Sequence, residues 1–123
     1  MFDVALTREI LSQIYGATQT ILRRFRQIRS PLDFTGSDEG MEKLDAICMQ
    51  LIAIGESVKN LDKVTAGALL PHYPEIEWKR VMGLRDILSH HYFDIDAETV
   101  YEVCTKHIPK LAESVYRILD ELR

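Results

Sequence analysis

Long apolar runs are missing from this sequence. A helix that crosses a bilayer needs about 20 consecutive, mostly apolar residues, and no segment reaches that length. The first four residues, Met-Phe-Asp-Val, lack the basic region and apolar stretch of a secretory signal. We therefore expect a cytoplasmic protein that does not contact membranes.

Cysteine is also scarce, with only Cys48 and Cys104 in 123 residues. Each lies in a segment of helical apolar periodicity, and neither has a histidine or acid at a spacing typical of a catalytic or metal site. A free cysteine in a reducing compartment behaves as a small apolar residue. We expect both to pack in the core unlinked, since a chain of this length folds without disulfide or metal staples.

Positive charge does not dominate, because 15 lysines and arginines stand against 19 acids and the net charge is −4. A protein that coats nucleic acid nonspecifically must neutralise many phosphates, so this balance argues against a DNA-coating protein. Two local clusters are basic, namely Arg23, Arg24, Arg26 and Arg29, and Lys79, Arg80 and Arg85. The first cluster suits the negative end of a helix dipole, with contact to RNA phosphates as the alternative.

Apolar residues recur at intervals of three and four, the pattern of amphipathic helices. We expect helices over 3–29, from 37 or 38 to about 61, from 75 to 90, and from 96 onward, with a loop over 32–40 and a turn around 65–70. Pro109 lacks a backbone N–H, so the last helical region should be kinked or divided. With no strand alternation and no repeat, residues 1–123 are predicted to form one all-α domain, a bundle of four to five helices.

Several residues are predicted to be structural. Gly55 lies inside the second helix, where glycine costs about 1 kcal/mol relative to alanine, so another helix should pack closely there. Trp78 precedes an apolar stripe and is predicted to anchor the core. Glu56 is interpreted as a surface acid in preference to a partner of a functional residue, and His72 and His107 as solvated or capping residues.

Residues 85–92 place a guanidinium, an acid, two imidazoles and a phenol near the expected end of a helix. Successive helical residues turn by ~100°, so Asp86 and His90, four apart, share a face. Asp86 could then fix the tautomer of His90 and raise its basicity. Arg85 lies roughly 140° from His90 around the helix. The two converge only if the helix end loosens, if Arg85 reaches around it, or if a second subunit contributes.

These residue types suit cleavage of an RNA phosphodiester without a metal ion. Histidine can take a proton from the 2′-hydroxyl or give one to the leaving oxygen, and the donor fork of arginine can stabilise charge on the phosphoryl group. A two-histidine metal site is the rival, but His90 and His91 are adjacent, point in different directions and have no further ligand at metal spacing. A helix end with solvated charges is the structural alternative.

The same segment resembles a known motif. Arg85, the polar Asp86, His90 and Tyr92 resemble the R-x4-H-x-Y motif of the HepT-like branch of the HEPN superfamily. Similar flanking segments are 54–57, 73–76 leading to Trp78, 83–93 and 108–111. The resemblance covers most of the chain, and the N-terminal helix matches least specifically.

This resemblance implies a HEPN-like homodimer whose paired motifs line a cleft at the subunit interface. It implies a metal-independent endoribonuclease without a cofactor, the toxin of a type VII toxin–antitoxin system acting on tRNA or mRNA. Arg85 and His90 would be the catalytic pair, with Asp86 and His91 supporting them. The antitoxin would be a minimal nucleotidyltransferase that transfers AMP to Tyr92, adding bulk and negative charge where an RNA phosphate must bind.

A second class of function fits the same sequence. A non-catalytic helical module could bind a nucleotide or a nucleotidyltransferase, and the negative net charge favours it slightly because RNA is a polyanion. The combination of Arg85 and His90 favours the ribonuclease, since a scaffold needs neither residue. A toxin converted to an immunity factor or a decoy is a third possibility.

Overall fold

The computed structural model describes residues 2–90 and 96–123, without the side chains of Ser89 and His90. Helices dominate these residues, and no strand occurs among them, so the predicted all-α class is confirmed. The elements in chain order are α1 (Val4–Phe25), α2 (Leu32–Thr35), α3 (Asp38–Val64), the 3₁₀ turn η1 (Leu70–His72), α4 (Trp78–Met82), α5 (Leu84–His90), α6 (Ala97–Glu102), the π-helical turn η2 (Val103–His107) and α7 (Ile108–Glu121).

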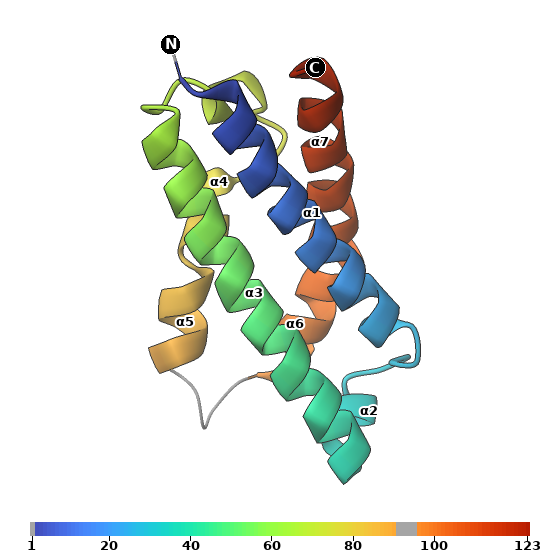
Figure 1. The fold of residues 1–123 in the computed structure, drawn as a ribbon. Coiled ribbons are helices and arrows are strands. Elements are labelled where there is room, and N and C mark those ends of the chain that lie inside the picture. Colours follow the sequence, from blue (N-terminus) through green and yellow to red (C-terminus); the bar gives the residue numbers. More distant parts are fainter. Residues whose placement is uncertain (1, 91–95) are drawn as a thin grey trace.

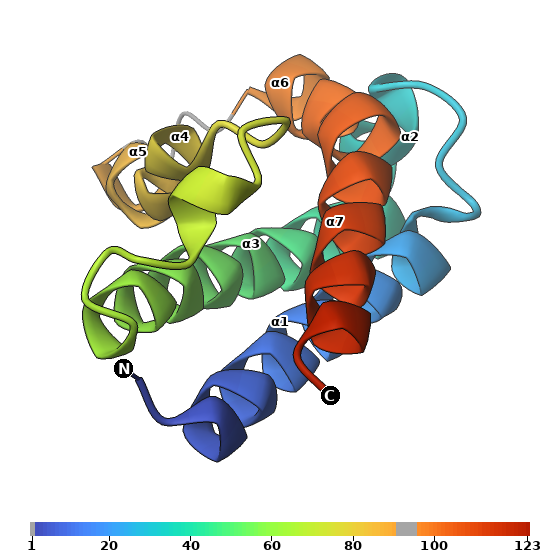
Figure 2. The same ribbon diagram turned by 90° about the horizontal axis from the view of Figure 1, so that it is seen from above.

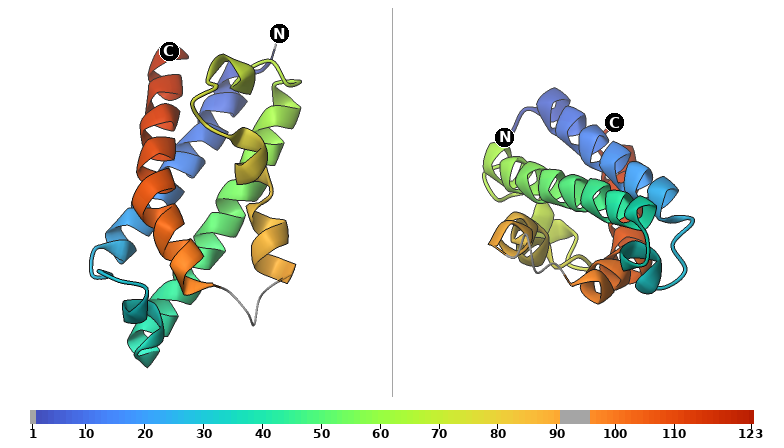
Figure 3. Two further views of the ribbon diagram at one scale, coloured as in Figure 1. Left: turned by 180° about the vertical axis from the view of Figure 1, so that it is seen from behind. Right: turned by 90° about the horizontal axis from the view of Figure 1, so that it is seen from below.

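Helix α3 is the central element of the bundle. It runs antiparallel to α1, and α7 packs along α1 (Figure 1). Seen from above, α4 and α5 lie on the side of α3 that is away from α1 (Figure 2). The views from behind and below show the same order, with α3 between α1 and α5 (Figure 3). The position of α5 is therefore set mainly by its contact with α3.

Local capping explains where three of the helices begin. The side chains of Asp3, Ser37 and Asp96 accept hydrogen bonds from the backbone N–H groups of Leu6 (3.1 Å), Gly40 (3.0 Å) and Glu98 (2.9 Å). Such caps satisfy N–H groups that have no partner within the helix. The predicted starts of α3 and of the last helical region are thereby confirmed.

One apolar core joins the helices. Its members include Leu11, Ile14 and Ile21 of α1, Ile47, Leu51, Ile54, Val58 and Leu61 of α3, Val100 of α6, and Ile108, Val115 and Ile118 of α7. Cys48 and Cys104 are buried in it and free, as predicted. Burial, with the charge of Asp45 adding to it, raises the pKa of Cys48 to about 11, and burial beside Cys48 raises that of Cys104 to about 12. Both are therefore neutral core thiols at physiological pH.

Packing shifts several predicted boundaries. Helix α1 ends at Phe25, one turn before Arg29, because the chain turns to bury Ile28, whose N–H donates to the Phe25 carbonyl at 2.9 Å. The expected loop over 32–40 contains α2, since Phe34 is fully buried with its ring 6.2 Å from that of Phe25. The turn expected at 65–70 lies at 70–72, and α3 continues to Val64.

The helix expected over 75–90 differs in two ways. It begins only at Trp78, and it is divided at Gly83 into α4 and α5. The Gly83 N–H donates to the carbonyls of both Lys79 and Arg80 at 3.1 Å, a shared bond typical of a helix end. The motif therefore lies on a short helix of its own.

Pro109 divides the last helical region as predicted. A proline cannot donate a backbone hydrogen bond, and its ring clashes with the carbonyl four residues earlier, here that of Thr105. The chain accommodates this with the π-helical turn η2 between α6 and α7. Within the described ranges, no helix is both long enough and apolar enough to cross a bilayer.

Trp78 is a core anchor, as its position in the sequence predicted. Its side chain is 8% exposed, and its Nε1–H donates to the Tyr73 carbonyl at 2.9 Å. We expect Trp78→Ala to lower the free energy of unfolding by about 3–5 kcal/mol, measured by urea denaturation. Trp78→Phe loses the indole hydrogen bond as well. It should still cost less than Trp78→Ala, because phenylalanine keeps most of the buried area. A loss below about 1 kcal/mol for Trp78→Ala would contradict this role.

Candidate functional site

The segment 85–92 lies partly outside the described residues. Arg85 and Asp86 stand in the first turn of α5, and both are exposed. His90 is the last residue of α5, and its side chain lies outside the description, as do His91 and Tyr92. The expected face shared by Asp86 and His90 thus stays a prediction, while the surroundings of Arg85 are defined.

Arg85 forms an ion pair with Glu56 of α3. Its Nη1 atom lies 3.2 Å from Glu56 Oε1, and the two side chains are 56% and 44% exposed. Glu56 is thus a surface acid by exposure, but it is also the partner of a predicted functional residue. The sequence left both interpretations open and favoured the surface acid; the structure shows a partly exposed acid that also contacts Arg85.

Gly55 brings α4 and α5 against α3 at this point. A Cβ atom built on Gly55 would lie 2.9 Å from the Val81 carbonyl oxygen, 3.4 Å from Leu84 Cβ and 3.5 Å from the Arg85 nitrogen. The first distance is shorter than real Cβ contacts allow. The close packing predicted at Gly55 is therefore confirmed. It brings the backbone of Arg85 close to α3, next to Glu56.

The Oε1 atom of Glu56 is sealed from solvent. It makes no hydrogen bond to any residue in the described part of the chain, so its contact with Arg85 is an ion pair without hydrogen-bond geometry. A buried carboxylate oxygen is costly to leave unpaired, and a nearby guanidinium offsets part of that cost. The positive charge of Arg85 therefore stabilises the Glu56 carboxylate.

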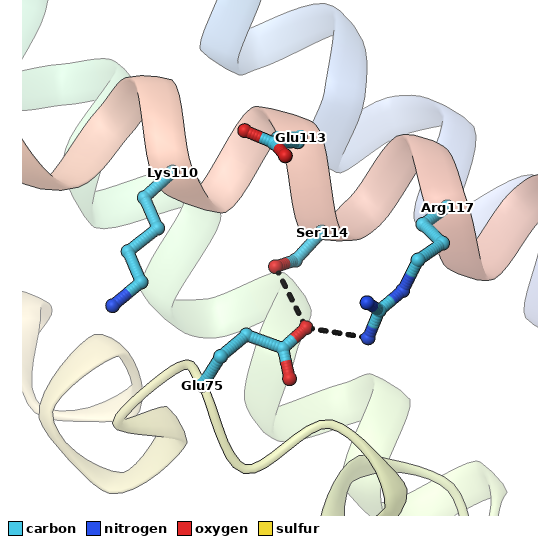
Figure 4. Close-up of a pocket in the computed structure, with 5 residues that line it drawn as sticks. All are labelled: Glu75, Lys110, Glu113, Ser114 and Arg117. Carbon is cyan, nitrogen blue, oxygen red and sulfur yellow. Dashed lines mark hydrogen bonds and ion pairs between the residues drawn. The ribbon is translucent and has the colours of Figure 1, made fainter.

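A shallow pocket of about 270 Å³ lies elsewhere, against α7. It is lined by Glu75, Lys110, Glu113, Ser114 and Arg117 (Figure 4). The Glu75 carboxylate accepts hydrogen bonds from Ser114 Oγ at 3.1 Å and from Arg117 Nη2 at 2.7 Å. None of the described residues of segment 85–92 lines the pocket, and Glu75 and Arg117 form an ion pair across it. We interpret it as the place where the segment before α4 is fastened to α7.

Tyr73 adds to this fastening. Its hydroxyl donates to Glu121 Oε1 at 2.6 Å, and the Arg117 guanidinium lies 5.1 Å from the centre of its ring. Burial, and then the bond to Glu121, raise the pKa of Tyr73 to about 12. The residues that precede α4 are thus held on α7, and these contacts fix the position at which α4 begins.

The Glu75 contacts predict a pH-dependent stability. The pKa of Glu75 is lowered, first by a hydrogen bond from its own backbone N–H, and also by Ser114 and by the charges of Arg117 and Lys110. A lowered folded-state pKa stabilises the protein above the ordinary glutamate pKa, and this gain is lost as the pH falls through the folded value. We expect Glu75→Gln to cost about 1 kcal/mol or less at pH 7, measured by urea denaturation, and the cost to disappear as the pH falls below the folded-state pKa of Glu75. Glu113→Gln, in the same pocket, is the matched control, and equal losses would contradict the assignment.

Among the side chains that the structure describes, which do not include that of His90, no three from histidine, cysteine, aspartate or glutamate are arranged to hold a metal ion. The arginine cluster lies at the C-terminal end of α1, where Arg23 and Arg24 form its last turn. This position suits the helix dipole.

Comparisons with known proteins point to one family. The sequence model of a family described as Ribonuclease HepT-like matches residues 18–118. A Methanocaldococcus jannaschii protein named gamma-glutamylcyclotransferase and putative RNase MJ0434 is 38% identical over 78 residues, which are 63% of this chain and 33% of that protein. A Caldanaerobacter subterraneus protein named putative RNase TTE0752 is 36% identical over 76 residues, 62% of this chain and 64% of that one.

A third relative carries a more specific name. A Thermococcus cleftensis protein named probable ribonuclease HepT is 32% identical over 66 residues, 54% of this chain and 56% of that protein. The match therefore spans less than two thirds of the length of each of these relatives. No solved structure is a significant match.

Proposed function

Because this chain belongs to the ribonuclease HepT-like family, we propose that it is an endoribonuclease that cleaves RNA through Arg85 and His90 without a metal ion. The observation that carries the proposal is the family match over 18–118, which includes the whole of segment 85–92. The geometry supports it, since Arg85 stands half-exposed on α5 and is fixed by contacts with α3.

The proposed reaction uses the RNA as its own nucleophile. His90 takes the proton of a 2′-hydroxyl, whose oxygen attacks the adjacent phosphorus while the bond to the 5′-oxygen breaks and that oxygen gains a proton. Arg85 stabilises the negative charge that builds on the phosphoryl oxygens. The products would be a 2′,3′-cyclic phosphate and a 5′-hydroxyl. Asp86, and His91 beside the pair, would support His90.

We extend the proposal to a homodimer. Helical spacing separates Arg85 and His90 by about 140° in α5, and Arg85 pairs with α3. A second subunit would complete each site with groups that one α5 cannot present together. Ile87 of α5 is 56% exposed, and such an apolar side chain is one that a subunit contact would cover.

The regulatory part of the proposal concerns Tyr92. We propose that the chain is a toxin whose antitoxin, a minimal nucleotidyltransferase, transfers AMP to Tyr92. The added phosphates would repel the RNA backbone and occupy its place near Arg85. Co-expression with such an enzyme should raise the mass of the chain by whole AMP units and abolish cleavage. Tyr92→Phe should keep its mass and its activity under the same conditions, and an unchanged wild-type mass would contradict the modification.

Cleavage of RNA in the presence of EDTA tests the proposed activity. The purified, unmodified chain should cut total RNA and tRNA, leave 2′-deoxy-substituted RNA intact, and lose nothing on addition of EDTA. Cleavage that requires a divalent ion would contradict the metal-free chemistry.

The negative net charge favours a second candidate, a non-catalytic module that binds nucleotides or a nucleotidyltransferase. That candidate predicts binding with no cleavage.

A further inference from the structure

We propose that Glu56 is the positioning residue of Arg85, and that it fixes the guanidinium where the RNA phosphate binds. This inference rests on the proposed ribonuclease function and deepens it. The two residues come from different helices, α3 and α5, and meet beside Gly55, where α4 and α5 pack closely on α3.

Free arginine side chains are poorly prepared for catalysis. An exposed arginine carries about 2 kcal/mol of rotamer entropy, and part of this must be lost when it grips a phosphate. A partner that orders the side chain in advance removes that cost before the substrate arrives. The ion pair with Glu56 supplies such a partner from α3, on which α5 is already packed.

The geometry leaves Arg85 available to the substrate. The ion pair with Glu56 is formed through Nη1, and the Arg85 side chain is 56% exposed. A guanidinium has five N–H donors, so those away from Nη1 can still bind a phosphate in the two-bond arrangement that arginine prefers. Glu56 would therefore orient the guanidinium through Nη1 and leave its other N–H groups available to the phosphate.

Glu56 is itself held in this role. Its Oε1 atom is sealed from solvent and lacks a hydrogen bond within the described part of the chain, so Arg85 provides its electrostatic compensation there. The carboxylate also offsets one positive charge at the site. Its removal should therefore loosen Arg85 and, at the same time, make the site more attractive to a polyanion.

These two effects give a distinctive kinetic result. Glu56→Ala should lower kcat by about 10- to 100-fold, as misplacement of a reacting group does, while KM stays the same or falls. Glu56→Gln keeps a side-chain oxygen at the same position and should recover part of kcat. Glu42→Ala is the matched control and should behave as wild type. It removes an exposed acid that lies about 21 Å from Glu56, toward the N-terminal end of α3.

A measurement that does not need activity tests the same contact. In ¹⁵N NMR spectra of the full chain, the Arg85 guanidinium should show restricted rotation in the wild type and in Glu42→Ala, and free rotation in Glu56→Ala. Equal Arg85 signals in the wild type and Glu56→Ala would overturn the proposal, as would a Glu56→Ala kcat within about twofold of wild type. A wild-type chain that cleaves no RNA would overturn the proposed function alone, because the NMR comparison still decides whether Glu56 positions Arg85.

Discussion

Arg85→Ala and His90→Ala should each reduce the rate of RNA cleavage by about 10²- to 10⁴-fold. Loss of a general base or acid typically costs that much, and loss of a donor to a developing anion costs about 10²- to 10³-fold. Single-turnover cleavage of tRNA with excess protein measures the chemical step without product release. Because the two residues serve one transition state, the double variant should be little slower than the slower single variant.

Matched controls exist for both substitutions. Arg80→Ala removes a 78%-exposed arginine of α4, whose partner is Glu77 at 3.2 Å, and should leave cleavage unchanged. His107→Ala removes an exposed histidine at the end of η2. All variants should keep the helical circular dichroism of the wild type. If either site variant cleaves RNA as fast as its control does, that residue is not part of the catalytic pair.

Gly55→Ala and Gly16→Ala should change stability in opposite directions. Both glycines lie inside long helices, so alanine should gain about 1 kcal/mol of helix propensity at each. A Cβ on Gly16 meets no atom within 4 Å, so the gain remains. A Cβ on Gly55 would lie 2.9 Å from the Val81 carbonyl oxygen, and such overpacking costs about 1–3 kcal/mol. We expect Gly16→Ala to be more stable than wild type and Gly55→Ala to be less stable.

The Gly55 substitution should also reach the site. The same Cβ would lie 3.5 Å from the Arg85 nitrogen, so moving α4 and α5 outward also moves Arg85. Gly55→Ala should therefore lower kcat even where urea denaturation shows the protein fully folded, while Gly16→Ala should not. An unfolding free energy for Gly55→Ala equal to that of Gly16→Ala would show that α3 does not constrain α5 at this position.

Several features of the fold depend on interactions within a few residues, and these could be predicted from the sequence. Apolar periodicity gave the all-α class, and short-range capping gave the starts at Ser37 and Asp96. Pro109 divided the last helical region because a missing N–H acts locally. Gly55 and Trp78 were predicted as packing positions from their residue types alone.

Other features depend on residues that are distant in sequence, and only the tertiary structure decided them. The early end of α1 and the presence of α2 accompany the burial of Ile28 and Phe34 in the shared core. The fastening of Glu75 to α7 likewise needs two separate segments in contact. In each case long-range packing outweighs a local preference of a few tenths of a kcal/mol per residue.

The candidate site divides in the same way. The residue types at Arg85, His90 and Tyr92, and the resemblance they carry, are properties of the sequence, and the roles of these residues remain predictions. The sequence also showed that Arg85 and His90 do not share a helical face. The partner of Arg85 was decided by the tertiary structure, because Glu56 lies on another helix and meets Arg85 beside the close packing at Gly55.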